Sequence, residues 1–198
     1  ALIDHGAKDL VAVSNNAGNG QVGLAALIAN GQVAKMICSY PRSSQSDVFQ
    51  EFYKAGKIDL EVVPQGTLAE RIRAAGAGIP AFYTPTSVGT PLAKGKEIRE
   101  FENKLYVMEQ SLRGDFALVK GDIADTKGNL TYNKTARNFG PIMCMACNTT
   151  IVQARQVAEP GEIDPEHVVS PGIFVNRIVE VPAPVHEDQL ISEGRHYP

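Results

Sequence analysis

The segment Val63–Thr67 (VPQGT) carries groups that are well suited to bind a negatively charged oxygen. It joins a β-branched run to a helical pattern that opens with Thr67 and Glu70, the S/T-x-x-E arrangement of a capping box. Free backbone N–H groups at a helix start, together with the Gln65 amide, suit an oxyanion or a carboxylate. A tight turn that requires Gly66 explains the same residues equally well. Taken alone, the segment leaves both interpretations open.

A glycine-rich loop, Gly18–Gly23 (GNGQVG), matches the G-x-G-x-x-G pattern between a predicted strand and a predicted helix. In dinucleotide-binding proteins these glycines make a tight turn and admit the pyrophosphate to the helix N-terminus. The next strand should then end in an acidic residue, but it ends in Ser39–Arg42 (SYPR), where Arg42 would at best favour a 2′-phosphate. The first glycine also comes too late after the strand. A flexible polar loop is therefore favoured, and an NADP-binding oxidoreductase domain remains the alternative.

Cysteine and histidine patterns indicate no metal site. Cys144 and Cys147 form a lone C-x-x-C, whereas zinc needs further ligands and the nearest histidine is His167. A thioredoxin-type redox pair would follow the first strand of its fold rather than lie in an apolar segment, so we expect packed core thiols. The histidines are scattered and lack an obvious Ser or Cys partner; they are His5, His167, His186 and His196.

The composition is that of a soluble globular protein of one domain. The chain has 198 residues, of which 43% are hydrophobic and 21% charged. Its net charge of -3 gives no electrostatic reason to expect nucleic acid or an anionic membrane as partner. No apolar stretch approaches the roughly 20 residues that span a bilayer, and the opening ALIDHGAKDL lacks the features of a secretory signal. The three cysteines argue against a disulfide framework and favour a reducing cytoplasm.

The first part of the chain alternates short β-branched runs with helical-period segments, which favours a parallel sheet covered by helices. We expect strands at Leu10–Ser14, Val33–Ser39 and Ile58–Val63, and helices at Val22–Asn30, Ser46–Ala55 and Thr67 to about Ala75.

The second part has a different pattern. It contains a Pro/Gly/Thr loop, a hairpin that turns at Glu102-Asn103, further strands and one apolar segment. These are expected at Thr84–Thr90, Ile98–Phe101 with Lys104–Glu109, Phe116–Lys120, Thr149–Ala154, Phe174–Val181 and Ile142–Ala146. The fold class is therefore α/β, an open and mostly parallel sheet with helices on both faces and a β-hairpin region. One domain should cover residues 1–181. The polar tail, residues 182–198, should be exposed or ordered only by a partner.

Three long blocks closely resemble the A subunit of family I CoA-transferases. They are SNNAGNGQVGLAALI (14–28), EVVPQGTLAERIRAAGAGIPAFYTPTSVGT (61–90) and GNLTYNKTARNFGPIM (128–143). The resemblance is collinear from the first residue to about Val181, so it is far more specific than any short motif above. SNNAGNG followed by SYPRSSQSDVF is most similar to the 3-oxoadipate branch. The acetoacetate and succinyl branch shares PQGTLAE and ARNF, so the branch is assigned less firmly than the family.

The resemblance implies a composite active site, which a homologous B subunit would form together with this chain. The nucleophile is a glutamate in a Ser-Glu-Asn-Gly motif of the B subunit, and this sequence contains no such motif. Its own Glu51, Glu70 and Glu109 are interpreted as helix-surface, capping and hairpin residues. The A subunits of this family begin with a strand and a G-G-F-x₃-G-x-P loop, and neither is present in this sequence. Because the nucleophile belongs to the B subunit, this chain is expected to be inactive alone.

Residues of the matched blocks are the predicted site. Gln65 and Gly66 are the expected oxyanion donors, and Arg42 is the candidate for a distal substrate carboxylate because it follows a strand's carboxyl end. The other predicted substrate-binding residues are Asn15, Asn16, Thr86, Gly89 and Asn138.

The implied reaction is covalent. The glutamate attacks an acyl-CoA, CoA thiolate returns to form a glutamyl-CoA thioester, and the acceptor acid then takes the CoA. Coenzyme A is a substrate, and no metal or redox cofactor is needed. The sequence thus predicts the A subunit of a succinyl-CoA:3-oxoadipate CoA-transferase, in a hetero-oligomer with its B subunit. A succinyl-CoA:acetoacetate enzyme comes next, and a non-catalytic ligand-binding module of the same fold is a further alternative.

Overall fold

The computed structural model describes residues 2–195. These residues form two compact units. The first unit contains the chain up to Leu68 together with the residues from Val185 onward, and the second unit contains Ala69–Pro184. No helix in residues 2–195 is both long enough and apolar enough to cross a lipid bilayer.

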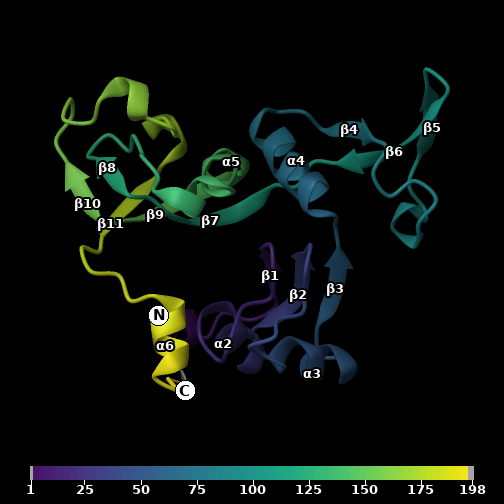
Figure 1. The fold of residues 1–198 in the computed structure, drawn as a ribbon, viewed down its shortest axis with the longest axis horizontal. Coiled ribbons are helices and arrows are strands. Elements are labelled where there is room, and N and C mark those ends of the chain that lie inside the picture. Colours follow the sequence, from purple (N-terminus) through teal and green to yellow (C-terminus); the bar gives the residue numbers. More distant parts are fainter. Residues whose placement is uncertain (1, 196–198) are drawn as a thin grey trace. The chain divides into compact units, whose positions relative to one another are not determined.

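The first unit is built on a three-stranded parallel sheet. Its strands are β1 (Leu10–Val13), β2 (Val33–Cys38) and β3 (Asp59–Val62), in the order β1-β2-β3. Helices α2 (Gly23–Ala29) and α3 (Val48–Lys54) connect the strands, as Figure 1 shows. Each predicted strand and helix of this β-α-β-α-β run is confirmed to within about two residues at either end.

The core of the first unit lies between the two helices and the central strand. Ile28 of α2, Met36 and Cys38 of β2, and Phe49 of α3 are all buried in one apolar cluster. Burial of such side chains contributes roughly 1.5–3 kcal/mol each relative to exposure. The packing therefore fixes β2 in the middle of the sheet and leaves the loops after the strands to carry polar groups.

Two short helices flank this sheet in the sequence. Helix α1 (Leu2–His5) opens the described chain, and helix α6 (Glu187–Ser192) lies within the segment predicted as a polar tail. Ile191 of α6 approaches Gly20 so closely that a Cβ on that glycine would lie 2.8 Å from the isoleucine Cγ1. This part of the tail therefore packs on the glycine-rich loop of the same unit.

Helix α4 (Gln65–Gly76) begins two residues earlier than the capping-box pattern predicts, and the predicted cap is wrong. The Leu68 N–H donates to the Pro64 carbonyl at 2.8 Å, so the first helical turn already closes over Pro64. Pro64 directly precedes the first helical residue, and because proline has no N–H it adds no unpaired donor at the helix start. Thr67 is consequently buried inside the first turn, and Glu70 forms an ion pair with Arg73 at 2.7 Å instead of capping.

The second unit contains an antiparallel sheet in the order β4-β6-β5. The strands are β4 (Ala81–Thr84), β5 (Ile98–Phe101) and β6 (Lys104–Gln110). The predicted hairpin is confirmed, and its turn residues Glu102 and Asn103 have φ of 48° and 60°. Positive φ at both central residues is the signature of a type I′ turn, whose twist matches that of the flanking strands. A short 3₁₀ helix, η1 (Pro91–Ala93), lies between β4 and β5.

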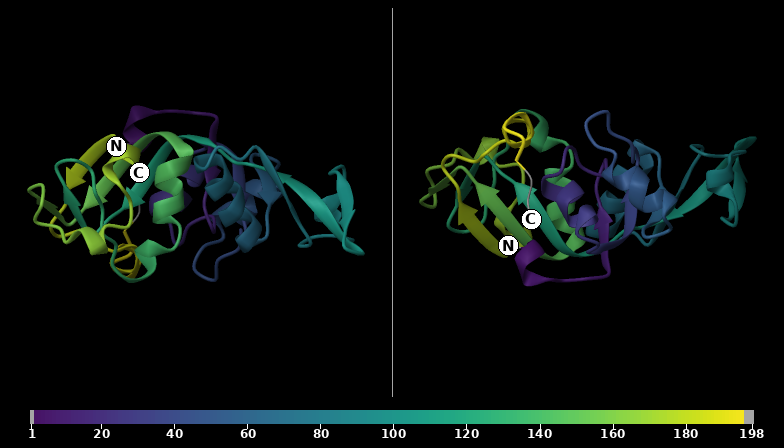
Figure 2. Two further views of the ribbon diagram at one scale, coloured as in Figure 1. Left: turned by 90° about the horizontal axis from the view of Figure 1, so that it is seen from above. Right: turned by 90° about the horizontal axis from the view of Figure 1, so that it is seen from below.

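Parallel pairing returns in the rest of the second unit. The strands β7 (Gly114–Lys120), β9 (Cys147–Ala154) and β11 (Arg177–Glu180) form a sheet in the order β11-β9-β7, and β8 (Ile123–Asp125) pairs with β10 (Gln156–Ala158). Helix α5 (Gly140–Ala146) lies on this sheet, as Figures 1 and 2 show. Its Cys144 belongs to a buried cluster that includes Val119 and Val152. Further 3₁₀ helices are η2 (Lys134–Arg137), η3 (Pro165–His167) and η4 (Gly172–Phe174).

The α/β class and the hairpin are confirmed, whereas the arrangement of strands in one open sheet is wrong for residues 2–195. The strands fall into three parallel sheets and one antiparallel sheet. Periodicity identifies strands but does not say which strands pair, and this chain divides its strands between two units. The strands β4, β8 and β10 are not predicted. For β8 and β10 the reason is their length, since a run of three residues gives little periodic signal.

Candidate functional site

Polar side chains gather where the three strands of the first unit end. Asn15 follows β1, Ser39 follows β2 and Gln65 follows β3, and the carboxyl ends of parallel strands lie at one edge of a sheet. The Gln65 Nε2 group donates to Asn15 Oδ1 at 3.0 Å, and the Ser39 hydroxyl donates to the same oxygen. We call these three residues the strand-end cluster. Open α/β sheets bind ligands at this edge, so the cluster is the candidate site.

The backbone of Asn15 is held as firmly as its side chain. Its carbonyl oxygen accepts hydrogen bonds from the Ser39 N–H at 3.2 Å, from the Tyr40 N–H at 3.0 Å and is 3.1 Å from the Ser39 hydroxyl. The neighbouring Asn16 turns its side-chain oxygen toward the Gly18 N–H, 3.0 Å away. Of the two asparagines predicted to bind substrate, Asn15 therefore joins the cluster, whereas the Asn16 oxygen is occupied within its own loop.

Gln65 and Gly66 form the first turn of α4 and are both exposed. The first N–H groups of an α-helix have no partner within the helix, so this turn presents donors beside the Gln65 amide. A Cβ added to Gly66 would meet nothing within 4 Å, and its φ is not positive. The structure thus gives no steric reason for glycine here, and the tight-turn explanation of the segment loses its basis.

Arg42 lies on the segment that follows β2 and Ser39. Its side chain is exposed, and within residues 2–195 no ion pair engages its guanidinium. The same segment is tied to the glycine-rich loop, because Ser43 Oγ donates to Asn19 Oδ1 at 2.7 Å and Ser46 Oγ donates to the Gly20 carbonyl at 2.6 Å. These ties hold the backbone near Arg42 while leaving its charge accessible.

The glycine-rich loop does not have the surroundings of a dinucleotide site. A Cβ on Gly18 would lie 2.6 Å from the Ala25 backbone nitrogen, so this glycine serves the close return of the loop onto α2. The Glu187 carboxylate lies 3.5 Å from Asn19 Nδ2, and its other oxygen would be 3.6 Å from a Cβ on Gly23, the first residue of α2. A carboxylate at that helix start is electrostatically unfavourable for a pyrophosphate. The NADP-binding alternative is therefore disfavoured.

The remaining predicted residues belong to the second unit. Thr86 and Gly89 lie in the loop after β4, where the Thr86 N–H donates to Thr84 Oγ1 at 3.2 Å and Gly89 has a φ of 76°. Asn138 follows η2, and its N–H donates to the Thr135 carbonyl at 3.0 Å. In the described part of this unit no hydrogen bond joins Asn138 to the Thr86 loop, so these are two separate polar loops.

Glu109 is a hairpin residue, as the sequence predicts, but it is not on the surface. Only 2% of Glu109 is exposed, and its carboxylate pairs with Lys96 at 2.5 Å. Side chains alternate between the two faces of a strand, so Glu109 shares the face of the buried Val107. That alternation is visible in the sequence. A carboxylate already paired in this way is poorly placed to act as a nucleophile.

The cysteines do not form a reactive or metal-binding pair. Cys144 is buried as predicted, and Cys147 is half-buried. Burial raises the pKa of both thiols above the ordinary value, which keeps them protonated and weakly nucleophilic. The Tyr132 hydroxyl lies 3.4 Å from Cys144 Sγ and 2.7 Å from Ser170 Oγ. Within residues 2–195, no three His, Cys, Asp or Glu side chains are grouped as metal ligands would be.

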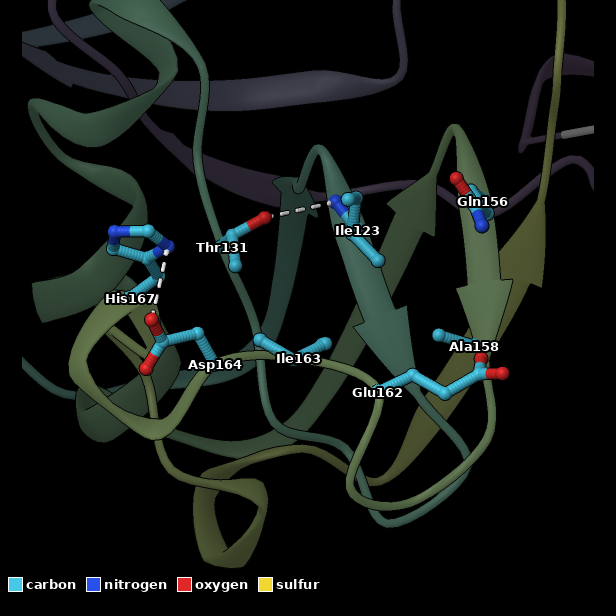
Figure 3. Close-up of a pocket in the computed structure, with 8 residues that line it drawn as sticks. All are labelled: Ile123, Thr131, Gln156, Ala158, Glu162, Ile163, Asp164 and His167. Carbon is cyan, nitrogen blue, oxygen red and sulfur yellow. Dashed lines mark hydrogen bonds and ion pairs between the residues drawn. The ribbon is translucent and has the colours of Figure 1, made fainter.

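A cavity of about 290 Å³ lies in the second unit (Figure 3). His167 Nδ1 and Asp164 Oδ2 are 4.0 Å apart at its rim, and the Ile123 N–H donates to Thr131 Oγ1 at 3.2 Å on its wall. Both members of the His–Asp pair are largely exposed, which makes their interaction weak. None of the predicted site residues lines this cavity, so it does not belong to the strand-end cluster.

Comparison with known proteins decides the family. The sequence model of the coenzyme A transferase family matches residues 1–181. The chain belongs to the coenzyme A transferase family. The strand-end cluster lies wholly inside the matched region, whereas α6 lies beyond it.

Three bacterial relatives illustrate where the chain falls within the CoA-transferases. It is 62% identical over 180 residues to the A subunit of the 3-oxoadipate CoA-transferase of Pseudomonas putida, covering 91% of this chain and 78% of the relative. The protein of the same name from Acinetobacter baylyi is 57% identical, with 91% and 79% covered. The A subunit of a probable succinyl-CoA:3-ketoacid coenzyme A transferase of Bacillus subtilis is 52% identical, with 90% and 74% covered.

Solved structures support the CoA-transferase fold. The apoenzyme of the acyl-CoA transferase YdiF from Escherichia coli O157:H7 aligns with a TM-score of 0.79 at 23% identity, covering 96% of this chain and 43% of that one. Glutaconate coenzyme A-transferase from Acidaminococcus fermentans aligns with a TM-score of 0.78 at 19% identity, covering 98% and 67%. At these identities the likeness concerns the fold alone.

Proposed function

We propose that this chain is the A subunit of a CoA-transferase that moves CoA from succinyl-CoA to 3-oxoadipate. The observation that carries the proposal is the 62% identity to the Pseudomonas putida protein over most of both chains. A succinyl-CoA:3-ketoacid enzyme is the second candidate, supported by the 52% identity to the Bacillus subtilis protein. Because these relatives are named as one of two kinds of subunit, a partner B subunit is expected, in a hetero-oligomer that completes the site.

The proposed reaction has four steps. A glutamate supplied by the partner attacks the thioester carbonyl of succinyl-CoA, which forms an acyl–glutamyl anhydride and releases CoA thiolate. The thiolate attacks the glutamyl carbonyl and releases succinate, leaving a glutamyl-CoA thioester. A carboxylate of 3-oxoadipate attacks that thioester and releases the thiolate again. The thiolate then attacks the acceptor's acyl carbonyl, which yields 3-oxoadipyl-CoA and frees the glutamate.

Each attack turns a carbonyl oxygen into an oxyanion, and the strand-end cluster has the chemistry to stabilise it. Gln65, Asn15 and the N–H groups at the start of α4 are neutral donors on rigid strand ends. Neutral donors suit charge that exists only in transit, because a fixed cation would also bind the ground-state carboxylates tightly and raise the rate less. Gln65 and Gly66 are the proposed oxyanion donors.

Substrate binding is assigned to the residues around this cluster. The accessible guanidinium of Arg42 is the proposed partner for the distal carboxylate of a dicarboxylic acceptor. Asn16 is a further proposed substrate contact of the same unit, through its amide nitrogen, because its oxygen accepts from the Gly18 N–H. In the second unit, Thr86, Gly89 and Asn138 remain predicted substrate-binding residues on separate loops.

The test is an acceptor panel with the assembled enzyme. This chain, co-expressed with its B subunit, should form 3-oxoadipyl-CoA from succinyl-CoA and use acetoacetate less well. Purified alone it should show no turnover, since the glutamate is supplied by the partner. A preference for acetoacetate would move the assignment to the second candidate. Full turnover by this chain without a partner would reject the composite site.

A further inference from the structure

Asn15 and Gln65 can pair in two ways, and the structure selects one of them. In the observed pairing the Gln65 NH₂ donates to Asn15 Oδ1 at 3.0 Å. In the reverse pairing both amides would be turned over, and the Asn15 NH₂ would donate to Gln65 Oε1. A side-chain amide accepts through its oxygen and donates through its nitrogen, so each pairing is chemically complete in itself.

The two pairings present different groups to a ligand. In the observed one, the Asn15 oxygen is occupied and both N–H groups of Asn15 remain to donate; in the residues described no protein partner takes them. One N–H of Gln65 also remains. In the reverse pairing, Asn15 would present its oxygen instead, and a bare acceptor repels an anionic substrate. The choice of pairing therefore decides whether Asn15 attracts or repels an oxyanion.

Ser39 determines which of the two pairings forms. Its hydroxyl has one proton to donate and two acceptors within reach, Asn15 Oδ1 and the Asn15 carbonyl oxygen at 3.1 Å. The carbonyl already accepts from the Ser39 and Tyr40 N–H groups, so the proton goes to the side-chain amide, whose oxygen is the atom that can accept it. The Ser39 N–H is fixed by the Asn15 carbonyl at 3.2 Å, so the hydroxyl is held next to the amide by the backbone as well. Ser39 is half-buried, whereas Gln65 is exposed, so the hydrogen bond between Ser39 and Asn15 lies on the inner side of the cluster.

We propose that Ser39 is a positioning residue, which holds the Asn15 amide with its oxygen inward and its NH₂ group available to the reacting oxyanion. The expected effect on catalysis rests on the proposed CoA-transferase activity, whereas the orientation of the Asn15 amide does not. Ser39 is assigned no contact with the substrate and acts through Asn15, to which both its hydroxyl and its N–H are hydrogen-bonded. The sharper assignment is that Asn15, with two uncommitted N–H groups, donates alongside Gln65 rather than merely contacting the substrate.

The kinetic test compares substitutions at Ser39 and Asn15 in the assembled enzyme. Ser39→Ala should lower kcat about tenfold, the equivalent of roughly one hydrogen bond, with little change in KM. Ser39→Thr keeps the hydroxyl and should restore kcat to within about threefold of the parent. Asn15→Asp can still accept from Ser39 and Gln65 but has lost its donors, so it should lose more activity than Ser39→Ala, about 100-fold or more.

A matched control is Ser192→Ala, which removes another hydroxyl of this unit, the one that donates to the Gln189 carbonyl within α6 at 2.8 Å. It should leave kcat within about twofold. If Ser39→Ala behaves like Ser192→Ala, or if Ser39→Thr is as impaired as Ser39→Ala, the positioning role is wrong.

A readout that needs no turnover separates this proposal from the proposed function. With the asparagine and glutamine side-chain amides of this chain labelled with ¹⁵N in the assembled complex, Ser39→Ala should shift the NH₂ signals of both Asn15 and Gln65. Ser39→Thr should leave them near their parent positions. If these shifts occur but the parent complex transfers no CoA, the orientation stands and the proposed function fails. If the parent is active and Ser39→Ala moves neither signal, the proposal fails and the function stands.

Discussion

Replacing Gln65 by alanine tests the oxyanion site most sharply, because the structure separates its catalytic effect from its effect on stability. The side chain is exposed and its hydrogen bond is to Asn15 Oδ1 at 3.0 Å. Losing one hydrogen bond of this kind costs about 0.5–1.5 kcal/mol of folding free energy at most. For a chain of this length that corresponds to a fall in Tm of no more than about 6 °C.

The expected catalytic loss is larger than that. One N–H of Gln65 is committed to Asn15, so the residue supplies a single donor to the oxyanion. Removing one such donor typically costs roughly 3–4 kcal/mol of transition-state stabilisation, or about 10²–10³ in kcat. Gln65→Glu should be at least as damaging. It would set a carboxylate oxygen against Asn15 Oδ1, and it would place a negative charge beside the developing oxyanion.

The assay is steady-state transfer of CoA from succinyl-CoA to 3-oxoadipate by the assembled enzyme, with a thermal melt of each variant. Gln50→Ala is the matched control, because Gln50 also carries an amide with one local hydrogen bond, to Asp47 Oδ1 at 3.3 Å. It should retain parent kcat. If Gln65→Ala keeps kcat within about threefold of the parent, or loses activity only by unfolding, Gln65 is a structural residue and the reasoning is refuted.

Three further substitutions test other parts of the account. Arg42→Met should raise KM for 3-oxoadipate about tenfold more than for acetoacetate, since only the dicarboxylic acid has a distal carboxylate for a bidentate guanidinium; equal effects in steady-state kinetics would argue against it. Gly172→Ala should lower Tm by about 5–10 °C, because the added Cβ would lie 2.1 Å from the Lys127 carbonyl oxygen; an unchanged melt would contradict this. Asn129→Ala should destabilise the fold at pH 7 by about 1–3 kcal/mol. Burial raises the pKa of Asp125, but hydrogen bonds led by that from Asn129 outweigh it and leave the pKa below the ordinary 3.8. The stability contributed by the ionised Asp125 carboxylate is therefore present above pH 3.8 and is lost as the pH falls through the lower folded pKa. In urea melts, the difference in unfolding free energy between the parent and Asn129→Ala should therefore become smaller below pH 3.8. A difference that does not change with pH would count against this explanation.

The positions of Gln65 and Asn15 at the ends of strands can be predicted from the sequence, but the hydrogen bond between their side chains cannot. Both are predicted from their positions after strands, and parallel strands bring such positions to one edge. The hydrogen bond between them and the contribution of Ser39 depend on side-chain rotamers, which no periodic pattern encodes. Ser39 directly follows β2, so its position after a strand marks it in the sequence in the same way as the other two residues.

Other features of the sequence mislead for identifiable reasons. The helix start predicted from the capping box at Thr67 is wrong, because the helix already begins after Pro64, whose carbonyl accepts the first helical hydrogen bond. The position of Glu109 in the hairpin is predicted correctly, but its burial is not, because a charged residue is usually exposed; here Lys96 compensates its charge and the strand alternation places it inside. The pairing of strands into separate sheets is a long-range property, and nothing in the spacing of apolar residues specifies it.

The central claim is that this chain provides donors and shape, while the covalent intermediate forms on the partner. Intact-mass measurement of both proteins, after the assembled enzyme has been mixed with succinyl-CoA and no acceptor, tests it directly. The account predicts the added mass of coenzyme A on the B subunit, removable by 3-oxoadipate, and no change in the mass of this chain. A CoA adduct on this chain, or turnover with no adduct on either protein, would contradict it.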